Sequence, residues 1–296
     1  MQPVPDPVTI SSLRAGDEVR GVFACVRKDR LMTRTGTPYL ALELRDRTGT
    51  VPARAFRDAD VLGARFDRGD LVTVIGRVER FRDELVVEVA DVRRPAAEAP
   101  EAAPESFLPT AYRDMEELDG FFEHLVSEVY DPGYRALLDG ILADTALRAQ
   151  LRRAPCSRAG HHAYLGGLLE HTVAVATLAR ETCELHRKLN SDLLITAALI
   201  HDIGRSAEFT YGAEIGLTEA GRVLGHLVLG QQLLEAREDF GALSQDRRLA
   251  LLHCLLTHHG SAQAPGGRFA SAEAVALYRL NAVDAAVKNT LEHGLT

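Results

Sequence analysis

Ten consecutive residues, from 95 to 104, consist only of proline, alanine and glutamate. This composition offers no large apolar side chain for a core and favours an extended, semi-stiff spacer. Short alternating stretches precede the spacer, whereas apolar residues at helical spacing follow it. The sequence therefore excludes one continuous core. It predicts a multidomain chain with a linker over residues 95–108.

Five stretches before the spacer have the alternating, β-branched pattern that is typical of strands. They cover residues 18–25, 39–44, 51–56, 71–80 and 84–92, with turn signals such as Thr35-Gly36 and Thr48-Gly49 between them. Five short strands suit a small closed barrel, and the OB-fold is the common five-stranded solution. Residues 10–94 are therefore predicted to form an N-terminal five-stranded OB-fold β-barrel.

The net charge of -8 conceals an asymmetry between the two parts. Residues 10–94 hold 17 Lys+Arg and 14 Asp+Glu, a net of +3, and the remainder holds 17 and 28, a net of -11. The barrel is therefore the expected anion-binding, nucleic-acid-binding domain. Single strands bind OB-folds by stacking on aromatic rings, but most of the available rings are expected inside the barrel, namely those of Phe23, Tyr39, Phe56 and Phe81.

Helical periodicity runs through the rest of the chain, residues 109–296. Seven helices are predicted, at 113–129, 133–152, 163–188, 191–203, 218–238, 244–259 and 271–292. An all-α domain of about 190 residues is therefore expected after the linker.

The absence of a long apolar run, of a signal-peptide pattern and of paired cysteines in the sequence predicts the location of the protein and the state of its thiols. No apolar run approaches the roughly 20 residues of a membrane span, and the first ten residues do not resemble a signal peptide. A cytoplasmic protein without membrane partners is expected. The four cysteines are far apart and form no CxxC pair, so buried, inert thiols are predicted at Cys25, Cys156, Cys183 and Cys254.

Two helical stripes place polar ligand-type side chains among apolar ones. His171 shares a face with Leu168 and Val175. Asp284 falls in a stripe of Leu277, Leu280, Val287 and Leu291. An ionised carboxylate among aliphatic side chains needs a cationic partner or a metal. His226 lies on a third such face.

Two further apolar segments end in potential ligands. Residues 193–200 lead into His201-Asp202-Ile203-Gly204, and residues 249–256 lead into Thr257-His258-His259-Gly260. Each glycine is a natural C-cap, and the negative ends of both helix dipoles favour a bound cation. One buried histidine alone is more often a core residue, but the combination indicates a metal centre.

These motifs resemble a known superfamily. The order H…HD…D is similar to that of HD-domain metal-dependent phosphohydrolases. The longer text His161-His-Ala-Tyr-Leu-Gly-Gly-Leu-Leu-Glu-His-Thr172, with His201-Asp-Ile-Gly, Gly225-His226 and His258-His-Gly260, resembles the bacterial YhaM-type 3'-to-5' exoribonucleases. Those enzymes join an N-terminal OB-fold to an HD domain. The similarity is strong over 155–290 and only architectural over 10–94.

Three departures from the family pattern bear on substrate preference. Arg205 stands where HDxGK has lysine, and Asn281 stands where aspartate is common. Residues 261–268 are unusually rich in glycine. None of these changes removes a metal ligand.

The resemblance implies two divalent ions. One is held by His171, His201, Asp202 and Asp284, and the other by His226 and His258 with Asp202 as a bridge. His259 is a further ligand or a phosphate contact. Manganese is the expected metal, with iron, cobalt and zinc as alternatives.

The same resemblance implies an activity and its residues. A metal-activated water hydrolyses single-stranded RNA, with single-stranded DNA as a further substrate, to 5'-mononucleotides. The catalytic residues are Asp202, Arg205 and His259. Arg205 neutralises the scissile phosphate or, alternatively, forms a structural salt bridge. Substrate contacts are also expected from His161, His162, Gly166 and Gly167, although close helix packing equally explains the two glycines.

Two alternatives remain open at this level. The same metals could serve a phosphohydrolase of nucleotides or cyclic dinucleotides, with the barrel in regulation or assembly. A nucleic-acid-binding protein without turnover is the second alternative, and the intact ligand set weighs against it. A homo-oligomer is compatible with each reading.

Overall fold

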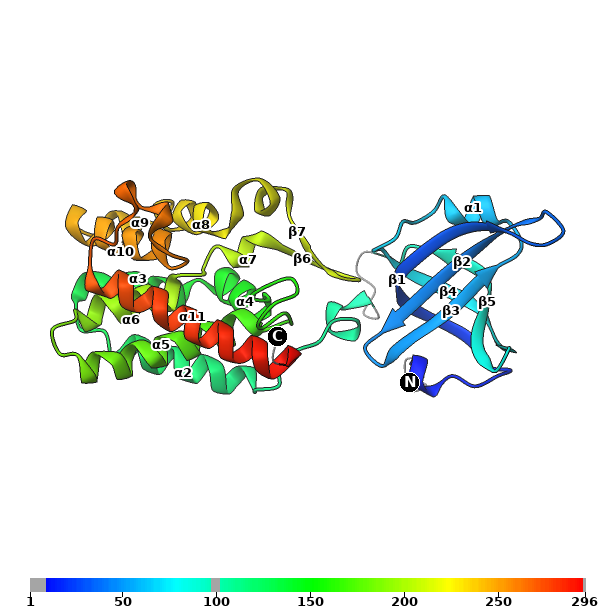
Figure 1. The fold of residues 1–296 in the computed structure, drawn as a ribbon, viewed down its shortest axis with the longest axis horizontal. Coiled ribbons are helices and arrows are strands. Elements are labelled where there is room, and N and C mark those ends of the chain that lie inside the picture. Colours follow the sequence, from blue (N-terminus) through cyan, green and yellow to red (C-terminus); the bar gives the residue numbers. More distant parts are fainter. Residues whose placement is uncertain (1–8, 97–101, 295–296) are drawn as a thin grey trace. The chain divides into compact units, whose positions relative to one another are not determined.

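The computed structural model describes residues 9–96 and 102–294 (Figure 1). It forms two compact units. The first runs to Pro109 and includes residues Tyr211–Gly216, and the second comprises Thr110–Thr210 and Leu217–Thr296. Five spacer residues, 97–101, lie outside the described part, so the predicted extended conformation of the spacer is not addressed there.

The first unit is a closed five-stranded barrel in the order β1-β2-β3-β5-β4. All neighbouring strands pair antiparallel except β3 and β5, which are parallel. The strands are β1 (Glu18–Met32), β2 (Pro38–Asp46), β3 (Gly49–Ala55), β4 (Leu71–Phe81) and β5 (Glu84–Arg93), and the short helix α1 (Ala59–Gly63) joins β3 to β4. The OB-fold prediction is confirmed.

The long strand β1 closes the barrel. Residues 18–24 pair with β4 and residues 24–32 pair with β2, with a β-bulge between Cys25 and Arg27. A bulge bends a strand and increases its twist, which lets β1 pair with β4 along its first half and with β2 along its second half. The inward side chains of β2 and β3 alternate as the sequence predicts, with Leu40, Leu42 and Leu44 facing Val51 and Ala53 in the core.

The second unit is helical. Its helices are α2 (Met115–Ser127), α3 (Pro132–Ala143), α4 (Thr145–Arg153), α5 (Gly167–Leu185), α6 (Ser191–Ile200), α7 (Arg205–Glu208), α8 (Glu219–Glu235), α9 (Glu238–Gly241), α10 (Gln245–Thr257) and α11 (Ala272–His293). The short strands β6 (Phe209–Tyr211) and β7 (Ile215–Leu217) form a hairpin between α7 and α8.

Helices α5 and α6 form the centre of this unit. Every residue of α6 from Leu193 to Ile200 is buried, and α5 packs against α2, α4, α6 and α11 (Figure 1). Side-chain caps define most helix starts, for example Asp114 before α2 and Asn190 before α6. Among the described residues, no helix is both long and apolar enough to cross a membrane.

Two of the differences between the predicted and observed helix boundaries have a clear backbone cause. The predicted helix 133–152 is two helices, because Asp144 has a non-helical ψ of 90° and caps α4 with its own side chain. The predicted helix from residue 163 begins only at Gly167, because Gly166 has a left-handed φ of 83°. Residues 161–166 are therefore a loop beside the start of α5.

Candidate metal centre

Six histidine and aspartate side chains from four segments of the helical unit meet in two overlapping groups. One group contains His171, His201 and Asp202, and the other contains Asp202, His226, His258 and His259. Each group brings its ligand atoms within 4.8 Å of one another. The sequence motifs that were far apart in the chain thus converge, with Asp202 common to both groups.

Hydrogen bonds fix three of the imidazoles with Nε2 toward the centre. His201 Nδ1 donates to the Ala198 carbonyl oxygen at 2.8 Å, and His258 Nδ1 donates to the Leu255 carbonyl oxygen at 2.7 Å. His171 Nδ1 donates to Asp284 Oδ2 at 2.6 Å. Because each Nδ1–H is donated to one of these acceptors, a neutral ring offers its Nε2 lone pair to a metal.

Asp202 lies between the two groups. Its Oδ2 is 3.8 Å from Nε2 of both His171 and His201, and its Oδ1 is 3.3 Å from Nε2 of both His226 and His258. Burial favours the protonated acid, but the neighbouring Arg205 charge holds the pKa of Asp202 well below its usual range. Burial also lowers the pKa of His201 far below its ordinary value, which leaves a neutral ring.

The donor set fits divalent cations. Asp202 Oδ1 and His258 Nε2 are buried and have no hydrogen-bond partner among the described residues, although such atoms normally find one. The Nε2 atoms of His171 and His201 are 3.1 Å apart, and those of His226 and His259 are 3.0 Å apart. Two nitrogens bound to one ion at about 2.1 Å are separated by roughly 3.0–3.4 Å. The cluster can therefore hold metal.

Asp284 has different neighbours from those predicted. Its Oδ2 accepts hydrogen bonds from His171 Nδ1 and from His162 Nε2 at 3.1 Å. The prediction that Asp284 lies among buried aliphatic side chains is wrong toward the end of the helix, because Val287 and Leu291 are 56% and 78% exposed. Asp284 thus orients the His171 ring in this structure, and its direct metal ligation stays a prediction.

Glu208, at the end of α7, was not identified from the sequence. Its Oε1 accepts the His226 backbone N–H at 3.2 Å and lies 3.6 Å from His226 Nδ1. That N–H is available because Gly225, with φ 70° and ψ 166°, interrupts α8 directly before His226. Glu208 and Gly225 therefore set the position of His226. In the sequence, the glycine directly before the candidate ligand His226 was the signal from which this arrangement could have been predicted.

Arg205 forms two ion pairs beside the centre. Its Nε donates to Asp202 Oδ2 at 2.7 Å and its Nη1 donates to Glu208 Oε2 at 3.1 Å. Its side chain is 11% exposed. These contacts correspond to the structural salt-bridge alternative, and a role on the scissile phosphate stays a prediction.

Neither of the two glycines predicted as C-caps has that role. Gly260 has a positive φ of 128°, but the C-cap of α10 is His258, two residues earlier, so the predicted C-cap role of Gly260 is wrong. Gly204 has an ordinary right-handed φ of -67°, so its predicted role as a C-cap is wrong. A Cβ at residue 204 would lie 2.1 Å from the His226 carbonyl oxygen and 2.4 Å from the Gly230 nitrogen. Gly204 instead lets the Asp202 turn approach the helix that carries His226.

Apart from Arg205, the residues predicted to contact substrate lie in the loop before α5 and at the first residue of that helix. A Cβ at Gly167 would lie 2.2 Å from the His162 carbonyl oxygen, and one at Gly166 would lie 3.0 Å from Met115. Close packing therefore accounts for both glycines. His162 is 1% exposed and bonds to Asp284 and the Tyr164 hydroxyl. His161 is half-buried, and its Nε2 lies 3.6 Å from Cys156 Sγ.

His259 is at the surface end of the centre. It is exposed, with its ring centroid 4.1 Å from that of His258. Partial desolvation of the ring, followed by the neighbouring His258, lowers its pKa to about 3, so the neutral imidazole can act as ligand. The position fits either of the roles left open by the sequence.

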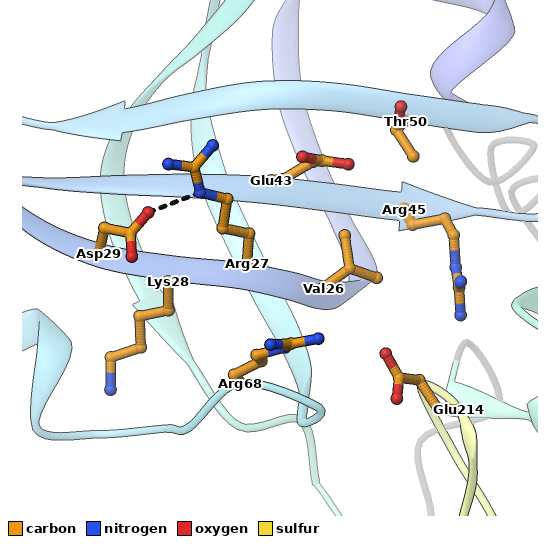
Figure 2. A pocket seen from close by; sticks show the side chains of 9 residues that line it. All are labelled: Val26, Arg27, Lys28, Asp29, Glu43, Arg45, Thr50, Arg68 and Glu214. Atoms are coloured by element: carbon orange, nitrogen blue, oxygen red, sulfur yellow. Dashed lines mark hydrogen bonds and ion pairs between the residues drawn. The ribbon is translucent and has the colours of Figure 1, made fainter.

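The barrel offers a second, different site. A pocket of about 530 Å³ is lined by Val26, Arg27, Lys28, Asp29, Glu43, Arg45, Thr50, Arg68 and Glu214. Figure 2 shows Arg45, Arg68 and Glu214 directed toward the same space. Arg27 pairs with Asp29 at 2.6 Å, and Arg45 donates to the Ala213 carbonyl oxygen. Among the described residues, Arg68 has no ion-pair partner.

Two of the barrel's rings are exposed, contrary to the expectation that most would be in the core. Phe23 is 1% exposed, but Phe56 and Phe81 are 43% and 45% exposed. Tyr39 stacks on Phe56 with ring centroids 5.3 Å apart. The Arg54 guanidinium lies 4.4 Å from the centroid of the Phe81 ring. Exposed rings flanked by arginine can stack with unpaired bases.

Comparison with known proteins agrees with this geometry. Residues 168–286 match the HD domain family, and residues 19–94 match the OB-fold nucleic acid binding domain family. The 3'-5' exoribonuclease YhaM of Bacillus velezensis is 26% identical over 249 residues, which cover 84% of this chain and 78% of that protein. YhaM of Bacillus subtilis is 24% identical over the same shares.

Among solved structures, the second OB-fold domain of replication protein A from Methanococcus maripaludis is 19% identical over 31% of this chain, with a TM-score of 0.26. By the two family matches, the chain contains an HD domain within its helical part and an OB-fold nucleic acid binding domain ahead of it. Its curated relatives over most of its length are 3'-5' exoribonucleases named YhaM, and the resemblance drawn from the motifs is confirmed.

Proposed function

We propose that this protein is a metal-dependent 3'-to-5' exoribonuclease that degrades single-stranded RNA to 5'-mononucleotides. The observation that carries the proposal is the shared carboxylate of Asp202. It lies 3.3 Å from two imidazole nitrogens through one oxygen and 3.8 Å from two others through the second. Divalent ions held by Asp202 and these histidines would supply an activated water and stabilise the entering and leaving oxygens of a phosphodiester.

The residues of the chain prepare this reaction in three ways. His171, His201 and His258 hold their Nε2 atoms inward through fixed Nδ1 hydrogen bonds. Arg205 keeps Asp202 ionised and partly offsets the charge of a phosphate brought beside it. The exposed His259 ring is placed to contact the substrate phosphate or to complete the ligand set.

Features of the barrel argue for a single-stranded substrate. Phe56 and Phe81 are exposed beside arginine-bearing strands, and Arg68 is a cation of the pocket without an ion-pair partner in the described part of the chain. Stacking and backbone charge are the two means by which OB-folds hold single strands. The relatives named YhaM act from the 3' end, which supports that polarity here. Single-stranded DNA is a second candidate substrate.

A degradation assay tests the proposal. The purified protein is incubated with Mn²⁺ and a 5'-labelled single-stranded RNA, beside a circular RNA of the same sequence and free nucleotides. The expected result is a ladder that shortens from the 3' end, release of 5'-mononucleotides and an intact circle.

Other outcomes select the alternatives. Hydrolysis of nucleotides or cyclic dinucleotides with intact RNA indicates a small-molecule phosphohydrolase. RNA binding without turnover in any of Mn²⁺, Fe²⁺, Co²⁺ or Zn²⁺ indicates a non-catalytic binding protein. Cleavage of the circle indicates an endonuclease and overturns the proposal.

A further inference from the structure

One buried thiol lies against the metal centre. Cys156 is 0% exposed and belongs to the segment between α4 and α5. Its Sγ is 3.6 Å from Asp202 Oδ2 and 3.6 Å from His161 Nε2. The ligand-type atoms of Cys156, His161 and His171 all lie within 4.8 Å of one another. This thiol is therefore in a cluster of metal-ligand side chains.

The separations match those of ligands around one tetrahedral ion. With a metal–sulfur distance of about 2.3 Å and a metal–oxygen or metal–nitrogen distance of about 2.1 Å, the tetrahedral angle separates the two ligand atoms by about 3.6 Å. A right-angled octahedral pair at the same bond lengths would be only about 3.1 Å apart. The observed 3.6 Å distances fit the tetrahedral case.

We propose that Cys156, supported by His161, is a sulfur ligand of the metal centre on the side of His171 and Asp202. The divalent ion replaces the thiol proton: the S–H bond breaks, a metal–sulfur bond forms and the proton leaves to solvent or buffer. Oxidation states do not change. The inference rests on the metal centre of the proposed function and extends its ligand set.

The consequence is a change in metal preference. Thiolate ligands favour zinc, iron and cobalt over manganese, whereas imidazole and carboxylate alone discriminate less. This chain is therefore expected to bind a thiophilic ion at the Cys156 side, in contrast to the manganese that the family resemblance implies. The opposite side, with His226, His258 and His259, contains no sulfur ligand in its group.

Cobalt and zinc loading test the assignment without using activity. Protein stripped with a chelator is loaded with Co²⁺, its bound metal is counted, and near-ultraviolet absorption is recorded for thiolate-to-cobalt charge transfer. Zinc-loaded protein is examined by X-ray absorption for a sulfur neighbour at about 2.3 Å. Both signals are expected in the wild type and in Cys254→Ser, whose buried thiol lies on α10. Both are expected to vanish in Cys156→Ser.

Competition between Mn²⁺ and Zn²⁺ gives a third readout. Cys156→Ser is expected to reduce the preference for zinc at one site by at least about tenfold. Wild-type protein that binds metal but has no sulfur neighbour overturns the inference, because Cys156 then only donates its S–H to Asp202. Wild-type protein that binds no metal overturns the proposed function as well, so the two failures are distinguishable.

Discussion

At the scale of single residues, we expect Asp202 to have the largest effect on metal binding, because it is common to the two ligand groups of the centre. We expect Asp202→Ala to lower bound metal from two ions to fewer than one and RNA turnover by at least about 10³-fold, roughly 4 kcal/mol. Metal analysis of the purified variant and the 5'-labelled RNA assay measure the two losses.

The control for this change is Asp139→Ala. Asp139 is exposed on α3 and pairs with Arg135 away from the centre. It is expected to retain both metal and turnover. Full activity in Asp202→Ala would contradict the proposed mechanism.

Glu208 is a positioning residue for His226. In Glu208→Gln the amide oxygen can still accept the His226 N–H, but the negative charge beside His226 Nδ1 and Arg205 is lost. The affinity for one of two ions is expected to fall by about 10–100-fold. Calorimetric titration with Mn²⁺ resolves the two sites. Equal weakening of both ions, or a similar effect in the exposed Glu235→Gln, would argue against this role.

At the scale of elements, Asp144 separates α3 from α4. Its side chain accepts the Leu147 N–H at 3.0 Å, and removal of an N-cap typically costs about 1 kcal/mol. This hydrogen bond, followed by the pairing with Arg237, holds the pKa of Asp144 below its usual value. The free energy of unfolding should therefore fall by about 1 kcal/mol in Asp144→Ala at pH 7.

The pH dependence of this loss follows from the direction of the shift. A lowered folded pKa means that the carboxylate stabilises the fold fully above its ordinary pKa of about 4 and loses that contribution as the pH falls through the folded value. Urea unfolding between pH 7 and pH 2 should show wild type and Asp144→Ala converging. A constant difference would contradict the assignment.

The turn at Gly204 and helix α8 approach each other too closely for any side chain. In Gly204→Ala the new Cβ meets backbone atoms of His226 and Gly230 at 2.1 and 2.4 Å. Overpacking of this kind lowers the free energy of unfolding by about 1–3 kcal/mol. It is also expected to move His226 away from Asp202. Urea unfolding and metal analysis should show both effects, whereas Gly241→Ala, which has nothing within 4 Å, should lack them.

At the scale of the whole molecule, the proposed function assigns substrate binding and chemistry to different units. Arg68 lines the barrel pocket, while the metal ligands all belong to the helical unit. Arg68→Ala is therefore expected to raise KM for a long single-stranded RNA and to reduce the slope of log affinity against log salt by about 1. Turnover of a dinucleotide should be unchanged.

Filter binding at several salt concentrations and parallel kinetics on both substrates measure these effects. The matched control is Arg135→Ala, an exposed arginine of α3 in the helical unit. An equal fall in dinucleotide turnover in Arg68→Ala would place that residue in catalysis rather than binding.

The sequence alone determined much of this protein. Alternation at 39–44 and 51–56 predicted strands, because inward and outward side chains of a strand alternate in polarity. The motifs around His171, His201 and His258 predicted a metal centre, because several histidines and aspartates on apolar helix faces and at helix ends together form a set of metal-ligand side chains. Boundaries such as Gly166 and Asp144 depend on single backbone angles that periodicity does not record.

Only the tertiary structure decided which partners those residues have. Asp284 contacts His171 and His162, Glu208 orients His226, and Cys156 lies beside Asp202, in each case through atoms brought together from different elements. The periodicity of a sequence specifies the face of a helix on which a side chain lies. The packing of several helices around α5 and α6 determines which side chains of other elements that face meets.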